Sequence, residues 1–219
     1  MTNRIISFCI AALMTSVVQA EMRPYALEVL VFARPKPVQS ITEMFPAIEP
    51  KPPESFDLSF ALDSGFKNLK ALPNSSRILR DAALLIQTEL NGQILFHKSW
   101  IHPLTNNQSS NPWFRITGEA GRELQLNGYL RWSIDRFIEV SADLRVTRSG
   151  ARRAPDGTSL DEVYHLKEFR KMSSKDIHYL DHPAFGVIIA SEQIVLAEPQ
   201  AQPADAMSES ETQPPPRAQ

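Results

Sequence analysis

The sequence predicts an α+β fold, a single domain with a mainly antiparallel sheet of about six strands and one main helix packed on one face. Two patterns lead to this prediction. Residues 124–132 and 138–146 alternate apolar and polar side chains, which is typical of strands that bury one face. Residues 75–90 (SSRILRDAALLIQTEL) repeat apolar side chains every three or four positions, which is typical of an amphipathic helix.

The elements can be placed in chain order. Residues 25–33 (YALEVLVFA) are mostly apolar and predict a strand buried on both faces, at the centre of the sheet. The serines that open residues 75–90 are natural N-cap residues for the helix. The alternating segments 123–132 and 137–146 are expected to pair as an antiparallel hairpin around residues 133–136. The other strands are expected at residues 92–104, 164–172 and 185–196.

Composition excludes several classes of function. The chain has 219 residues, with 23 basic and 25 acidic side chains and a net charge of −2. A non-specific nucleic-acid binder needs an excess of basic residues, so we expect no nucleic-acid partner. The 8 glycines argue against a glycine-dense phosphate loop.

The first 20 residues are typical of a cleavable signal peptide. Arg4 precedes an apolar run at residues 5–18, and a cleavage site follows at Ala20. The run is shorter than the ~20 apolar residues that a spanning helix needs, so we expect export without stable membrane insertion. The single cysteine, Cys9, lies in this leader, so the mature chain is expected to contain no disulfide, thiol nucleophile or thiolate metal site.

The mature chain divides into a folded domain and a tail. Residues 21–197 are expected to form the α+β domain. Within it, residues 35–53 contain six prolines and predict an extended surface loop, because proline lacks a backbone donor and restricts the residue before it. Residues 198–219 are acidic and contain five prolines, so they predict a disordered tail.

The segment IHYLDHP contains the densest group of side chains that could carry chemistry. On a helix, His178, Asp181 and His182 would share one face and could bind zinc. Pro183 disfavours helical geometry at His182, and no glutamate lies between the histidines to serve as a hydrolytic base. The alternative is a polar turn whose side chains hydrogen-bond the backbone before the last strand. We expect no metal, no cofactor and no catalytic residue.

Basic residues gather late in the sequence. If the late strands are neighbours, their arginines and lysines would form a positive patch, and an exposed Tyr129 and Phe137 would add stacking surface for sugars. The alternative is an ordinary solvated strand face. The residues of this group are Arg145, Arg148, Arg152, Arg153, Lys167, Arg170, Lys171 and Lys175.

Four segments resemble the CsiV-type peptidoglycan-binding family of Gram-negative bacteria. They are ALEVLVFAR (residues 26–34), LFHKSWIHP (95–103), RFIEV (136–140) and, most specifically, FRKMSSKDIHYLDHPAFGVII (169–189). The resemblance implies a non-catalytic periplasmic protein that binds peptidoglycan. It also implies that the protein supports a class A penicillin-binding protein through the outer-membrane lipoprotein activator of that enzyme.

The resemblance assigns no contact residues, so we nominate them from their chemistry. Aromatic and imidazole rings can stack on sugars, and cations can pair with stem-peptide carboxylates. Two other functions stay open, a wall hydrolase or metal-dependent enzyme that uses His178, Asp181 and His182, and a pure protein–protein adaptor that pairs through a sheet edge. The candidate binding residues are His178, Tyr179, Asp181, His182, Arg170 and Lys171.

Overall fold

The computed structural model of the chain describes residues 22–35, 52, 54–106 and 111–194. Three predictions fall wholly or mostly outside these residues: the leader at 1–20, the proline-rich loop at 35–53 and the acidic tail at 198–219. They therefore stay predictions. In the described part, no helix is both long and apolar enough to cross a membrane.

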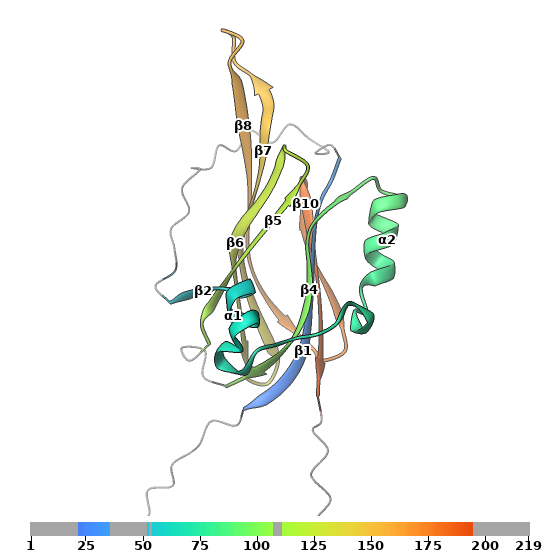
Figure 1. Cartoon of the computed structure of the whole chain (residues 1–219), viewed down its shortest axis with the longest axis vertical. Coiled ribbons are helices and arrows are strands. Elements are labelled where there is room, and N and C mark those ends of the chain that lie inside the picture. The colour runs from blue at the N-terminus through green and yellow to red at the C-terminus, as the bar shows by residue number, and fades with distance from the viewer. Residues whose placement is uncertain (1–21, 36–51, 53, 107–110, 195–219) are drawn as a thin grey trace, which may run out of the picture.

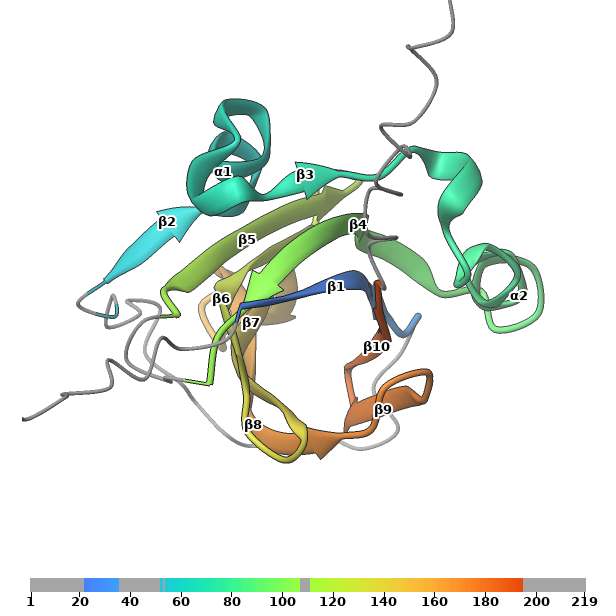
Figure 2. The same ribbon diagram turned by 90° about the horizontal axis from the view of Figure 1, so that it is seen from below.

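Two sheets of five strands face each other across the main core (Figures 1 and 2). The strands of sheet A are β1 (Arg23–Ala33), β3 (Lys70–Ala71), β4 (Gln93–Leu104), β9 (Ile177–His182) and β10 (Phe185–Gln193). The strands of sheet B are β2 (Ser55–Asp57), β5 (Trp113–Ala120), β6 (Leu124–Ile134), β7 (Ile138–Arg153) and β8 (Ser159–Met172).

The strand order is β3-β4-β1-β10-β9 in sheet A and β2-β5-β6-β7-β8 in sheet B. Among the described strands, β2 and β5 pair in parallel and the other neighbours pair antiparallel. The structure is therefore mainly β. The helical elements are short: α1 (Leu58–Ser64), α2 (Arg80–Thr88) and the 3₁₀ turns η1 (Phe66–Asn68) and η2 (Asn74–Ser76).

The predicted fold class needs correction in its architecture. Antiparallel pairing predominates as expected, and α2 packs on one face of a sheet, but the strands form two sheets rather than one. Alternation shows that a strand buries one face, yet it does not reveal whether a helix or a second sheet covers that face. The predicted hairpin is present as β6 and β7, which pair from Leu124↔Arg148 to Ile134↔Ile138.

The inner faces of the two sheets form one continuous core. Trp100 of sheet A and Trp132 of sheet B are fully buried, and their rings meet edge to face at 5.2 Å. Along one side the sheets approach so closely that a Cβ on Gly118 of β5 would lie 1.8 Å from the carbonyl oxygen of Leu95 in β4. Only glycine fits there. Each large side chain buried in this core contributes about 2 kcal/mol of transfer free energy.

His102 lies in the same core. Its Nδ1 accepts a hydrogen bond of 3.4 Å from Trp100 Nε1, and its ring meets Phe114 edge to face at 5.3 Å. Loss of solvation on burial, with a smaller contribution from the charge of Lys67, lowers the pKa of His102 to about 3. The imidazole is therefore neutral at pH 7.

Helix α2 covers the outer face of sheet A, where Leu30, Ile86 and Ala190 belong to a second apolar cluster (Figure 2). We expected a serine to cap this helix, but its N-cap residue is Leu79, which makes no side-chain cap hydrogen bond. Glu28 of β1 instead holds the two residues that precede the helix. Its carboxylate accepts hydrogen bonds from the Ile78 backbone N–H at 2.7 Å and the Leu79 backbone N–H at 3.2 Å.

Candidate functional site

The segment IHYLDH is the edge strand β9, and neither the helix nor the polar turn that we considered. Because side chains alternate along a strand, the candidate residues of this segment divide between two faces. His178 and His182 point inward with the fully buried Leu180, and Tyr179 and Asp181 point outward. Imidazoles and carboxylate lie on opposite faces, so these side chains cannot converge on one metal ion. Within the described part of the chain, no group of three histidine, cysteine or acidic residues is arranged to hold a metal.

The inward histidines have structural surroundings. His182 is buried, and its Nδ1 accepts a hydrogen bond of 3.1 Å from the Ala184 backbone N–H at the turn into β10. Its ring packs against Phe185, with the ring centres 4.8 Å apart. His178 is half-buried, and its Nε2 has no hydrogen-bond partner among the described residues. His182 therefore makes the backbone contact that the turn alternative predicted, although from a strand.

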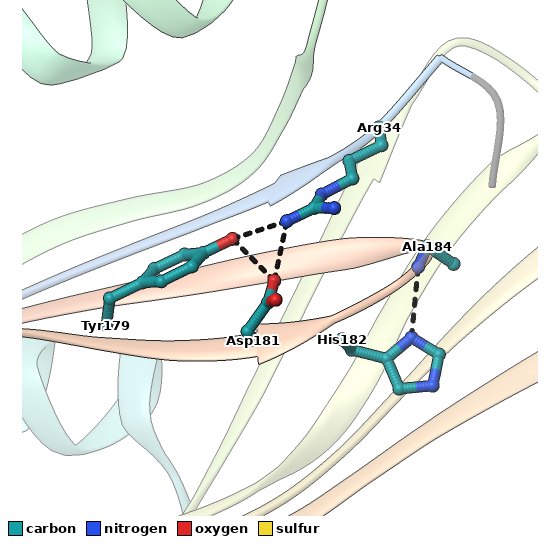
Figure 3. A network of polar contacts seen from close by, with 5 residues as sticks. All are labelled: Arg34, Tyr179, Asp181, His182 and Ala184. Atoms are coloured by element: carbon teal, nitrogen blue, oxygen red, sulfur yellow. Dashed lines mark hydrogen bonds and ion pairs between the residues drawn. The ribbon is translucent and has the colours of Figure 1, made fainter. Parts of the chain in front are cut away.

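The outward residues of β9 join a polar network with Arg34, which follows β1 (Figure 3). Arg34 Nη2 donates to the Tyr179 hydroxyl at 2.8 Å and to Asp181 Oδ1 at 2.5 Å, and the Tyr179 hydroxyl donates to the same Oδ1 at 2.8 Å. Desolvation, followed by the hydrogen bond to Asp181, raises the pKa of Tyr179. The phenol thus stays protonated and able to donate at neutral pH. Figure 3 shows His182 directed away from this network.

A groove of about 480 Å³ opens beside the network, between the C-terminal end of α2 and strand β9. The Phe32 and Tyr179 rings are nearly parallel there, with an angle of 13° between them and centres 6.4 Å apart. Tyr179 is 43% exposed, whereas Phe32 is buried. We call this the Tyr179 groove, and it is lined by Phe32, Arg34, Pro35, Ile86, Leu90, Gly92, Tyr179 and Ile188.

Gly186 of β10 makes this arrangement of rings possible. It lies between Phe32 and Asp181 in the sheet register. A Cβ at this position would lie 2.6 Å from the Phe32 ring and 2.7 Å from the Tyr179 hydroxyl oxygen. A larger residue would therefore displace the two aromatic side chains of the groove.

Sheet B also supports the groove. Arg148 of β7 donates from Nη2 to the backbone carbonyl of Arg34 at 2.9 Å, so it holds the end of β1 in place. Arg148 belonged to the basic group singled out in the sequence. Its contact is structural rather than part of an exposed patch.

The candidates Arg170 and Lys171 lie on β8, in the other sheet. Arg170 pairs with Glu168, and Lys171 Nζ lies 3.6 Å from Glu139 Oε1. The structure therefore brings together Tyr179 and Asp181 but places these two cations in separate ion pairs. Arg34 and Phe32 were missed as site residues, although both lie in the ALEVLVFAR segment.

The outer face of sheet B carries much of the basic group. Asp143 is its centre: Oδ1 lies 2.8 Å from His165 Nε2 and 3.3 Å from Arg145 Nη1, and Oδ2 lies 3.9 Å from Lys167 Nζ. Tyr129 is only 5% exposed, so our expectation of an exposed tyrosine on this face is wrong. Phe137, at 42% exposure, is accessible as expected.

Comparisons with known proteins identify a family. Comparison with curated proteins and with solved structures returns no significant match. A family model described as "Peptidoglycan-binding protein, CsiV" matches residues 4–194, which include every residue of the Tyr179 groove. The chain belongs to the CsiV peptidoglycan-binding protein family.

Proposed function

We propose that this protein is a non-catalytic periplasmic accessory protein that binds peptidoglycan through the Tyr179 groove. Family membership implies the peptidoglycan binding. We further propose that the protein supports cell-wall synthesis by a class A penicillin-binding protein through the lipoprotein activator of that enzyme. The single observation that carries the location of the site is the exposed Tyr179 ring beside the Arg34 guanidinium.

The chemistry of the groove suits this polymer. Peptidoglycan combines sugar rings and methyl groups with the carboxylates of its stem peptides. The groove offers apolar walls from Phe32 and Ile188 and a guanidinium that can give a charge-assisted hydrogen bond to a carboxylate. Because the polymer repeats its ligand many times, an intact sacculus presents a high concentration of sites, which raises the bound fraction of the protein even when each contact is weak.

Co-sedimentation with purified sacculi tests this proposal. Protein lacking residues 1–20 is expected to sediment with sacculi. We expect Tyr179→Ala or Arg34→Ala to lower the apparent affinity for sacculi about tenfold, as is typical for the loss of a central aromatic or arginine contact. Ile177→Ala is the matched control for Tyr179→Ala, because Ile177 is 60% exposed on the same face of β9 but does not line the groove. Arg170→Ala is the matched control for Arg34→Ala.

Three outcomes would contradict parts of the proposal. Recovery of all the wild-type protein in the supernatant at moderate salt would contradict the proposal that the protein binds peptidoglycan. Equal losses in Ile177→Ala and Tyr179→Ala would place the contact elsewhere. Release of soluble muropeptides during the incubation would favour a hydrolase.

The partner is tested separately, by pull-down with the purified lipoprotein activator in the absence of glycan. Specific capture supports the accessory role in synthesis. Sedimentation with sacculi combined with no capture would limit the function to wall binding.

A further inference from the structure

We propose that the Tyr179 groove recognises a zwitterionic amino-acid end, with an ammonium and a carboxylate on one carbon, of the kind that an uncross-linked stem-peptide diamino acid presents. This inference rests on the proposed function and specifies the part of the polymer that the groove binds. The network around Arg34 leaves hydrogen-bonding atoms of Arg34 and Asp181 free for such a ligand.

Arg34 keeps two of its three guanidinium nitrogens available as donors. Both of its side-chain hydrogen bonds within the described residues leave from Nη2, to Tyr179 and to Asp181. Nε and Nη1 have no hydrogen-bond partner among those residues, and the side chain is 29% exposed. An arginine held in place with free donors can give a charge-assisted hydrogen bond to a carboxylate.

Asp181 is complementary to Arg34 in the same way. Its Oδ1 accepts both of its hydrogen bonds, from Arg34 and from the Tyr179 hydroxyl. Oδ2 accepts none from the described residues, and the side chain is 60% exposed. The Tyr179 hydroxyl uses its proton for Asp181, so it fixes the carboxylate rather than the ligand. A positive and a negative group are thus held side by side, each with atoms free to hydrogen-bond a ligand.

This paired arrangement matches a zwitterion better than a neutral sugar. A sugar ring would cover the free Arg34 donors and the free Asp181 Oδ2 without supplying a charged partner for them, and polar atoms that lose water without a partner are costly. An amino-acid end offers a carboxylate to Arg34 and an ammonium to Asp181 at once. Its aliphatic stem can then lie along Phe32, Ile86 and Ile188, which form the apolar wall of the groove.

The proposal has a consequence for the state of the wall. Cross-linking converts the ammonium of the diamino acid into an amide and so removes the positive charge that faces Asp181. The groove should therefore prefer uncross-linked stem peptides, as found in newly made material.

Titration calorimetry with a synthetic stem peptide tests this inference. The probes are L-Ala-γ-D-Glu-meso-diaminopimelate and the same peptide acetylated on the free amine of its diaminopimelate residue. We expect wild-type protein to bind the acetylated peptide at least about tenfold more weakly, since one charge-assisted contact is lost. Asp181→Asn should bind the two peptides equally, and Asp176→Asn, in the turn before β9, is the control.

The outcomes separate this inference from the proposed function. Equal binding of the two peptides by wild-type protein would overturn the inference. Sedimentation with sacculi stripped of their peptides, at the affinity seen with intact sacculi, would also overturn it and would leave peptidoglycan binding in place. Failure to sediment with intact sacculi would remove the proposed function itself.

Discussion

The outer faces of the two sheets differ in the side chains they carry and in what covers them. Sheet A presents apolar side chains such as Leu30 and Ile188, and helix α2 covers them except at the Tyr179 groove. Sheet B presents charged side chains around Asp143, and none of the described helices packs on them as α2 packs on sheet A. Asp143, Arg145 and His165 are largely buried in their own ion pairs, so a ligand on sheet B would meet mainly exposed lysines such as Lys167, whose charge is screened by salt. A ligand in the groove would be held by shape and paired charges. Salt and single substitutions should therefore affect the two faces differently.

The packing of helix α2 on sheet A should show the largest loss of stability on substitution. Glu28→Ala removes the acceptor of two backbone N–H groups at the start of α2, and that of His97 Nε2 at 2.7 Å. We expect the free energy of unfolding to fall by about 3 kcal/mol, because buried donors lose their partner. Urea denaturation measures this loss. Glu89→Ala, at the exposed C-cap of the same helix, is the control, and its unfolding free energy should stay near that of the wild type. If Glu28→Ala left the unfolding free energy unchanged, apolar packing alone would hold the helix.

The core shared by both sheets should respond to pH through His102. The pKa of the folded protein, about 3, lies below that of the unfolded chain, so the unfolded chain gains a proton first as pH falls. Stability should then be complete above pH 6.5 and should decrease by about 2 kcal/mol between pH 6.5 and 5, continuing down to about pH 3. His102→Gln keeps an acceptor for Trp100 but does not titrate. Its unfolding free energy should change less over the same range, and an unchanged pH dependence would assign the effect to other groups.

The packing beneath the groove should show a smaller effect on stability with a clear effect on binding. Gly186→Ala pushes a methyl group into the Phe32 ring and the Tyr179 hydroxyl. Overpacking of this kind costs typically about 1–3 kcal/mol, and we expect the low end because Tyr179 is partly exposed and can move. Because the substitution displaces the Tyr179 side chain and its hydrogen bonds, the affinity for sacculi should fall as well. Gly157→Ala is not a suitable control, because Gly157 has a φ of +84° and alanine would be strained there. Ala190→Gly, on the same strand as Gly186, is a better control for a change of one methyl group.

The exposed cations of sheet B should have the smallest effect. Lys167 is 75% exposed and pairs with Asp143 at 3.9 Å, and Lys171 is 59% exposed. Surface pairs contribute little, so Lys167→Ala with Lys171→Ala should change stability by less than about 1 kcal/mol. Sacculus binding at physiological salt should change less than about twofold. A large loss of binding, reversed at low salt, would shift the main contact from the groove to sheet B.

The sequence predicted best the elements whose pattern is local. The alternation around Trp132 and Val140 identified the β6–β7 hairpin, and the apolar run that contains Leu30 identified β1. The start of α2 was misplaced because the backbone just before it is held by Glu28, 50 residues before Ile78, and no local signal reports such a contact.

The candidate site was predicted only in part, for a similar reason. In HYLDH both strand faces carry polar residues, so the alternation of apolar and polar side chains that marks a strand is hidden. The spacing of His178 and His182 also equals about one helical turn, which favours a helix instead. Tyr179 and Asp181 were nominated for their chemistry. Their partner Arg34 lies 145 residues from Tyr179, and only the pairing of β1 with β10 and of β10 with β9 brings them together.

The pairing of β1 with β10 also determines how the protein can be attached to a surface. Tyr25 pairs with Gln193, and the Ile194 N–H donates to the Pro24 carbonyl at 2.9 Å, so the chain enters and leaves the described fold at one end (Figure 1). Gly186 and Arg34 lie towards the other end of the same strands, roughly 25 Å away at the usual rise per residue. Attachment through either flank of the described fold, at residue 22 or at residue 194, should therefore leave the groove at the end away from the surface, so the two attachments should give similar binding in biosensor experiments.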